Sequence, residues 1–553
     1  MNLILRYFKE AVRRFPRQFL ASMALILVIT AMDTFVPWGL RQYIDQVSRR
    51  DDYAVLALGI GFFACYLLVK VFIKIAWYLS LDRFGGAYIE ELSLSAERSM
   101  AEASYADVER LDPAVVRNIL YTDIFNVFRV IGHAAPSMLG ALAVILAALG
   151  ISFFCEPRMT VLILLAAAFG LLLSWLSRKV LSRTAGRTNA KMKVHDAWCT
   201  QFVEMLPLIQ TGGLLDYYQG KTSANLRDFI DTAIREDWHT IFWTELLSGY
   251  HTLFSIALSA LLAIPAAGNS VANLMFFTMV SSLIMDQSRL LESHFQQVMK
   301  MHVSFAHVEV LRTLPKRQTG DGTGPFSSVT FRDAALTYPG GAAALKHINC
   351  TMERGDCIRL SGPNGSGKSS FIKLLTGLYP PDAGEVLLDG IPLPCYRQEA
   401  LERQILSISQ DERLLNETFQ DYLSLISGHP LEDEQARALL RQAGLPEDGR
   451  TIRDNGGSLS VGQRKKLLLL KLRLRLEEAP VVILDELTAG LDAETAGQVF
   501  ALIRETAAAG DKLLLVIDHT CGDELPFTRE FHFENGELHI SEPSFSSVAF
   551  GLE

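Results

Sequence analysis

The sequence predicts an α-helical domain that spans a membrane, followed by an α/β domain. Two observations predict this arrangement. Hydrophobic residues make up 49% of the 553 residues, and nearly all the long apolar runs fall before about residue 300. Beyond them, charged and apolar stretches alternate, and a glycine-rich segment lies between a predicted strand and a predicted helix. We place the helical domain at residues 1–318, a Gly-rich linker at 319–328 and the α/β domain at 329–553.

Six apolar windows in the first domain are predicted to cross the membrane. A span needs about 20 mostly apolar residues, because the bilayer core is about 30 Å thick and a helix rises about 1.5 Å per residue. The last two windows are interrupted by Glu245, His251 and Asp286, so their edges are less defined than their existence. The windows are Phe19–Leu40, Ala54–Leu79, Ala134–Cys155, Met159–Leu176, Thr240–Pro265 and Val271–Met285.

The distribution of Lys and Arg predicts the orientation of these spans. Segments 1–18 and 178–193 carry eleven cations, whereas the flanks on the other side carry four. Cytoplasmic flanks are enriched in Lys and Arg, so both termini and the α/β domain are expected in the cytosol. The chain is thus predicted to be a multi-pass protein, placed in a bacterial inner (plasma) membrane. The cytosolic connections, roughly 80–133 and 177–239, are long and helical in pattern, whereas the outer loops are very short.

Ionisable residues at membrane depth are candidates for substrate contact, because their burial in lipid costs a few kcal/mol or more. Structural explanations remain open for some of them. Lys70 and Lys74 could extend to the interface, and Asp286 could pair with Arg289 one turn away. The candidates are Asp33, Lys70, Lys74, Glu245, His251 and Asp286.

The segment from Arg359 to Ser370 contains the pattern G-x-x-x-x-G-K-S between a strand and a helix. Its glycines allow backbone N–H groups to surround phosphates, and the following helix directs its positive end at them. Lys368 is expected to reach the β- and γ-phosphates of ATP, and Ser369 to ligate Mg²⁺. The predicted phosphate-binding residues are Gly362, Asn364, Gly365, Ser366, Gly367, Lys368, Ser369 and Ser370.

Two later apolar strands end in polar residues that suit ATP hydrolysis. Val481–Leu484 leads into Asp485 and Glu486, and Leu513–Ile517 leads into Asp518 and His519. In P-loop ATPases the first acid holds Mg²⁺, and an adjacent acid can orient or deprotonate the attacking water. The position of His519 at the end of a strand directs it toward the γ-phosphate.

With the segment Leu459-Ser460-Val461-Gly462-Gln463, the chain resembles the ATP-binding cassette (ABC) transporter family, specifically half-transporters with a six-helix exporter-type membrane domain. The resemblance implies that Tyr338 stacks on adenine and that Gln410 senses Mg²⁺ and the attacking water. It makes Glu486 the catalytic base and His519 the switch histidine. The signature residues Ser460, Gly462 and Gln463 would contact the γ-phosphate held by a partner subunit.

This sequence departs from the family pattern at Val461, where the signature usually has glycine, and at Leu487 and Gly490. None of these changes removes a group that the chemistry requires. The resemblance also implies two cytosolic coupling segments, around Asp107–Thr122 and Phe202–Thr211, although both could be solvated helical extensions.

The expected function is ATP-driven transport by a dimer of half-transporters, most simply a homodimer that exports an amphipathic or peptide-like compound. The alternatives are import of a metal chelate or siderophore-type compound, and pairing with a different half. A nucleic-acid partner is disfavoured by the net charge of −9 and by the predicted spans. A membrane regulator that binds ATP without turnover is disfavoured by Glu486 and His519.

Overall fold

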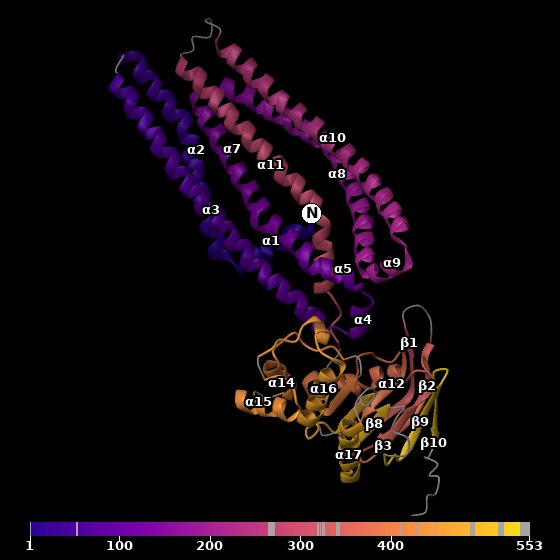
Figure 1. The fold of residues 1–553 in the computed structure, drawn as a ribbon. Coiled ribbons are helices and arrows are strands. Elements are labelled where there is room, and N and C mark those ends of the chain that lie inside the picture. Colours follow the sequence, from indigo (N-terminus) through magenta and orange to yellow (C-terminus); the bar gives the residue numbers. More distant parts are fainter. Residues whose placement is uncertain are drawn as a thin grey trace, which may run out of the picture. The chain divides into compact units, whose positions relative to one another are not determined.

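The computed structural model divides the chain into two compact units (Figure 1). The first comprises Met1–Ser99 and Pro113–Thr313, and the second comprises Met100–Asp112 and Leu314–Glu553. The structure describes residues 2–50, 53–263, 271–317, 320, 322, 327–338, 343–409, 412–428, 431–447, 449–486, 493–517 and 525–541.

The first unit is helical, and its longest helices exceed the thickness of a bilayer. Helix α3 has 50 residues, α8 has 48 and α10 has 49, which correspond to about 75 Å each. Figure 1 shows α8 and α10 side by side along most of their length. The elements are α1 Asn2–Arg14, α2 Pro16–Arg50, α3 Tyr53–Glu102, α5 Pro113–Asn118, η1 Ile119–Asp123, α6 Ile124–Phe128, η2 Arg129–Ala134, α7 Ala135–Cys155, α8 Pro157–Glu204, α9 Leu206–Gly212, α10 Leu215–Ala263 and α11 Val271–Arg312.

Four helices in the described part of the chain are long and apolar enough to cross a membrane: Pro16–Val47, Ala57–Glu102, Val115–Cys155 and Pro157–Ser177. They coincide with the first four predicted windows. The fifth and sixth windows lie in α10 and α11, where acidic residues and His251 dilute the apolar composition, and residues 264–270 lie outside the described chain. A total of six spans stays a prediction.

Among the predicted ionisable residues at membrane depth, Asp33, Lys70 and Asp286 form ion pairs and His251 is buried. Lys70 forms an ion pair with Asp33 across α2 and α3, and the Tyr66 hydroxyl donates to Asp33 at 3.4 Å. This ion pair neutralises the charge of Lys70 inside the helical unit. Lys70 therefore has an alternative to extending its side chain to the membrane interface. Asp286 and Arg289 lie 4.0 Å apart, in the pairing considered from their spacing. His251 is buried, with its side chain 4% exposed.

The second unit contains two sheets. One is antiparallel, in the order β2-β1-β4-β5, and the other has the order β10-β9-β3-β8-β7-β6, with β3, β6, β7, β8 and β9 parallel. The strands are β1 Ser328–Thr337, β2 Ala343–Glu353, β3 Cys357–Ser361, β4 Ala383–Leu388, β5 Ile391–Pro392, β6 Ile405–Ser409, β7 Val481–Asp485, β8 Leu513–Ile517, β9 Arg529–Glu534 and β10 Glu537–Ser541. The helices are α4 Tyr105–Glu109, α12 Lys368–Leu375, η4 Leu393–Cys395, α13 Gln398–Gln404, α14 Phe419–Ser427, α15 Asp433–Gln442, η5 Asp454–Gly456, α16 Val461–Arg475 and α17 Ala493–Ala509.

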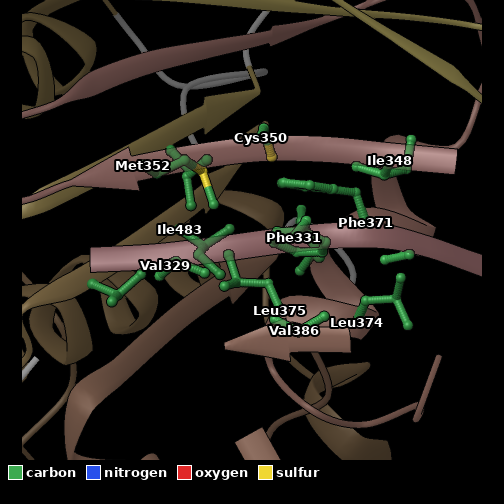
Figure 2. Close-up of a cluster of buried hydrophobic side chains, with 14 of the residues drawn as sticks. Val329, Phe331, Ile348, Cys350, Met352, Phe371, Leu374, Leu375, Val386 and Ile483 are labelled. Carbon is green, nitrogen blue, oxygen red and sulfur yellow. The ribbon is translucent and has the colours of Figure 1, made fainter. Parts of the chain in front are cut away.

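The core of this unit holds α12 in place between the two sheets. The ring of Phe371 in α12 stacks on Phe331 of β1 with centroids 4.5 Å apart. Figure 2 shows these rings among Leu374, Leu375 and Ile483, all of them buried. Because α12 follows the glycine-rich loop directly, this packing fixes where the loop ends.

Candidate nucleotide-binding site

The glycine-rich loop joins the end of β3 to the start of α12 and requires glycine at defined positions. Gly362, Gly365 and Gly367 have φ angles of 129°, 78° and 118°, a region that disfavours other residues. A Cβ atom on Gly362 would lie 2.2 Å from the backbone oxygen of Phe533. One on Gly367 would lie 2.8 Å from the backbone oxygen of Ala344. The neighbouring strands therefore leave room for backbone alone.

Lys368 begins α12 and is almost fully buried at 8% exposure. Its ammonium group donates hydrogen bonds to the backbone oxygens of Gly362 at 2.7 Å and Pro363 at 3.0 Å. The positive charge is thereby held over the loop, at the N-terminal end of a helix, where an anion is favoured.

Ser366 lies in the same loop and has a buried hydroxyl with no hydrogen-bond partner among the described residues. A buried polar atom without a partner is costly, and a phosphate oxygen placed in this loop would satisfy it. Ser369 is exposed at the loop and Ser370 is buried beneath it. The residues present therefore fit a nucleotide phosphate, and the Ser369 hydroxyl fits a hard cation such as Mg²⁺.

Tyr338, predicted to stack on adenine, is held beside the loop by three contacts. Its hydroxyl lies 3.2 Å from Ser370 Oγ, and its ring meets the Tyr379 ring edge-on at 5.4 Å. The Lys373 ammonium lies 5.0 Å from the centroids of both rings. Sequence reasoning missed Tyr379 and Lys373, whose only signal was an aromatic and a basic residue shortly after the loop.

Residues 100–112 cluster with this unit, close to the first predicted coupling segment. Helix α4 places the Tyr105 ring 5.8 Å from Tyr379, and Ala106 packs against the core. Within this unit, the Arg317 backbone N–H also donates to the Glu102 oxygen at 2.8 Å. The contacting helix is thus Tyr105–Glu109, two residues earlier than the start of the predicted Asp107–Thr122 segment. Residues from Pro113 onward belong to the first unit.

The two predicted acids lie at the carboxyl end of β7. Asp485 is in register with Ser409 of β6 and Ile517 of β8, so the strands ending near Gln410 and His519 meet at this edge. The Glu486 N–H donates to the Ile517 oxygen at 2.7 Å, and Glu486 has a φ of 49°. A left-handed non-glycine residue is uncommon and is concentrated at functional sites. Gln410, Asp518, His519 and residues 487–492 lie outside the described residues.

The signature segment caps α16. The Ser460 hydroxyl accepts from the Gln463 N–H at 3.2 Å, and the Gln463 side-chain oxygen accepts from the Ser460 N–H at 3.1 Å. This capping box starts the helix at Val461. Val461 is 67% exposed, and a Cβ atom on Gly462 would contact nothing within 4 Å. The capped N-terminus is therefore open to solvent within one chain.

Within the part of the chain that the structure describes, no hydrogen bond or ion pair joins residues 362–370 to residues 460–463. Residues 345–489, which include both segments, match the family model described as ABC transporter. The chain therefore contains a region similar to the ABC transporter family. The predicted fold class is confirmed, since the chain superimposes on the structure of a bacterial Atm1-family ABC exporter with ATP bound, with a TM-score of 0.81. That match covers 96% of this chain and 95% of the other, at 15% sequence identity.

Curated relatives resemble the chain over part of their length. An ATP-dependent lipid A-core flippase of Paraburkholderia xenovorans is 36% identical over 204 residues, which cover 35% of this chain and 33% of the flippase. The transport protein CydC of Haemophilus influenzae, described as a glutathione/L-cysteine system, is 29% identical over 46% of this chain and 47% of its own. The β-(1→2)glucan exporter NdvA of Rhizobium johnstonii is 26% identical over 62% and 60%. The chain thus spans about one third to three fifths of these relatives' length.

Proposed function

We propose that this chain belongs to the ABC transporter family and is an ATP-driven exporter that works as a dimer of half-transporters. The observation that carries this proposal is the pairing of a complete phosphate loop with a separate, capped and solvent-open signature segment. A nucleotide held at Lys368 would then be contacted on its other side by Ser460, Gly462 and Gln463 of a second chain's α/β domain. Closure around ATP is favoured only as far as ATP binds the closed pair more tightly than the open one.

The chemistry proposed for each closed site is hydrolysis of the β–γ phosphoanhydride of ATP. Mg²⁺ would supply positive charge at the phosphates, with Ser369, Gln410 and Asp485 as its candidate ligands. Glu486 orients a water molecule and accepts its proton as the water oxygen attacks the γ-phosphorus. Lys368 and the α12 N-terminus stabilise the phosphate charge, and His519 is proposed to contact the γ-phosphate.

A second copy of the chain is supported by the exposed apolar face of α10. Ile230, Ile234 and Trp238 are 43%, 60% and 61% exposed and recur every four residues, so they line one face. They precede the fifth predicted span, in the connection expected in the cytosol. A large apolar face exposed to water indicates a protein partner. We favour a homodimer over pairing with a different half, and mass measurement of the chain purified alone tests this choice.

Export of an amphipathic or peptide-like compound is favoured over import by the similarity to an exporter fold and by the similarity to a flippase and a glucan exporter. The proposed setting is a bacterial inner membrane with the cassette in the cytoplasm. In inside-out vesicles, export requires ATP-dependent accumulation of substrate inside, whereas import requires its loss from loaded vesicles.

The Glu486→Gln variant tests turnover, because it keeps the size of the side chain while removing the proton acceptor. We expect the parent to hydrolyse ATP at least about 100-fold faster than the variant, a typical contribution of a general base. Equal rates at equal ATP binding would refute coupled hydrolysis and leave a nucleotide-binding regulator.

A further inference from the structure

The N-terminal helix α1 is docked firmly on the end of α11. Its Tyr7 hydroxyl donates to Glu309 at 2.7 Å, and the Tyr7 ring packs edge-on against Phe305 at 5.4 Å. Arg312 of α11 donates to Glu10 at 2.8 Å. These contacts bury Tyr7 completely and hold α1 against the end of α11.

The outer face of α1 forms a hollow of about 440 Å³ that is lined by charged residues only: Arg6, Lys9, Glu10, Arg13 and Arg14. Three of them are neutralised by carboxylates or a guanidinium in the first unit. Arg6 pairs with Glu309, Arg14 with Glu91 at 2.6 Å, and Glu10 with Arg312.

Lys9 and Arg13 are the remaining cations of this hollow. Both are exposed, and neither has a carboxylate within 4.0 Å among the residues that the structure describes. They are four residues apart, so they project from the same face of the helix, where two like charges repel. An anion between them would turn this repulsion into attraction. The arrangement is therefore that of a site lacking its counter-charge.

The position of the hollow identifies which anion fits. Helix α1 ends at Arg14, and α2, which carries the first candidate span, begins at Pro16. Leu5 lies four residues before Lys9, on the same face of α1, and is 51% exposed. Leu20, near the start of α2, is 64% exposed, so exposed apolar side chains occur on both helices. The excess of Lys and Arg on this side predicts the cytoplasmic leaflet, where anionic lipids supply the negative surface charge.

We propose that the hollow on α1 binds the headgroup phosphate of an anionic phospholipid of the cytoplasmic leaflet through Lys9 and Arg13, with its acyl chains alongside Leu20. A free phosphate ion would gain nothing from the apolar surface, and a zwitterionic lipid brings its own ammonium group into the hollow. The site therefore selects lipids with net negative charge. This inference rests on the membrane placement of α2, and not on ATP hydrolysis or transport.

The experiment measures lipid binding to the purified full-length chain by native mass spectrometry, with phosphatidylglycerol and phosphatidylcholine of identical acyl chains. The test variant is Lys9→Gln with Arg13→Gln. The matched control is Lys221→Gln with Arg227→Gln, which removes the same charge from exposed positions in the cytosolic part of α10. A further variant, Arg13→Lys, keeps the charge.

We expect the parent, the control and Arg13→Lys to bind phosphatidylglycerol about tenfold or more tightly than phosphatidylcholine, and the test variant to lose most of that preference. A test variant that keeps the parent's preference overturns the proposal, as does an equal loss in the control. Displacement of phosphatidylglycerol by millimolar inorganic phosphate would also overturn it, in favour of a free-anion site. Unchanged ATPase activity of a well-folded test variant separates loss of this site from failure of the proposed transport function.

Discussion

Replacing Gly362 by alanine should distort the phosphate loop, and the structure gives the distances from which the free-energy cost follows. The new Cβ atom would lie 2.2 Å from the Phe533 oxygen and 3.0 Å from Ser366 Oγ, at a φ of 129°. Phe533 is fully buried and paired with Leu538 of β10, so its carbonyl has little freedom to retreat. The loop must move by about 1 Å instead. Backbone strain of about 1–3 kcal/mol and overpacking of about 1–3 kcal/mol then oppose the loop conformation that binds phosphate.

The control is Gly390→Ala in the turn between β4 and β5. Gly390 also has a positive φ of 76°, but a Cβ atom there would meet nothing within 4 Å. This variant carries a conformational cost of about 1–2 kcal/mol without a clash and without contact with the loop.

Binding of Mg-ATP to each full-length variant, measured by calorimetry, separates the two effects. Since about 1.4 kcal/mol corresponds to a tenfold change in affinity, Gly362→Ala should bind ATP at least about tenfold more weakly than the parent. Gly390→Ala should stay within about twofold, with a slightly lower melting temperature. A folded Gly362→Ala protein that binds ATP like the parent would refute the steric reasoning.

Three further predictions concern the packing, the signature helix and pH. Phe371→Ala, which removes the ring stacked on Phe331, should destabilise the α/β domain by about 3–5 kcal/mol, measured as a lower melting temperature. Phe371→Leu should lower the melting temperature less. Ser460→Ala should cost about 1 kcal/mol of helix stability by removing the cap on the Gln463 N–H, detected as faster amide exchange in the first turn of α16. Burial raises the pKa of Glu309, but hydrogen bonds from a guanidinium and a tyrosine hydroxyl outweigh it and leave the pKa below its ordinary value. Its stabilisation is therefore present at neutral pH and lost as the pH falls through the lowered pKa. Glu309→Gln should melt below the parent at neutral pH, and the two melting temperatures should converge in acid, below the ordinary pKa of a glutamate. Parallel curves would contradict this assignment.

Much of the nucleotide site followed from local sequence. The glycine-rich loop was predicted to lie between a strand and a helix, which the structure shows as β3 and α12, and the predicted strand Leu513–Ile517 matches β8. These predictions succeed because a buried parallel strand must be apolar throughout and a phosphate loop must be rich in glycine. The roles assigned to Gln410 and His519 stay predictions.

The sequence by itself determined the two-part architecture, the candidate spans and the phosphate loop. Each of these depends on residues that are adjacent in the chain, and on the free energy of moving their side chains from water into lipid or a folded core. Only the tertiary structure decided which side chains from distant segments form ion pairs or ring contacts. The pairs Asp33 with Lys70 and Arg312 with Glu10, and the ring contact of Tyr105 with Tyr379, join residues from different helices. Such pairings have no periodicity to reveal them, because a contact between distant segments depends on how whole helices pack and not on the spacing of residues within either one.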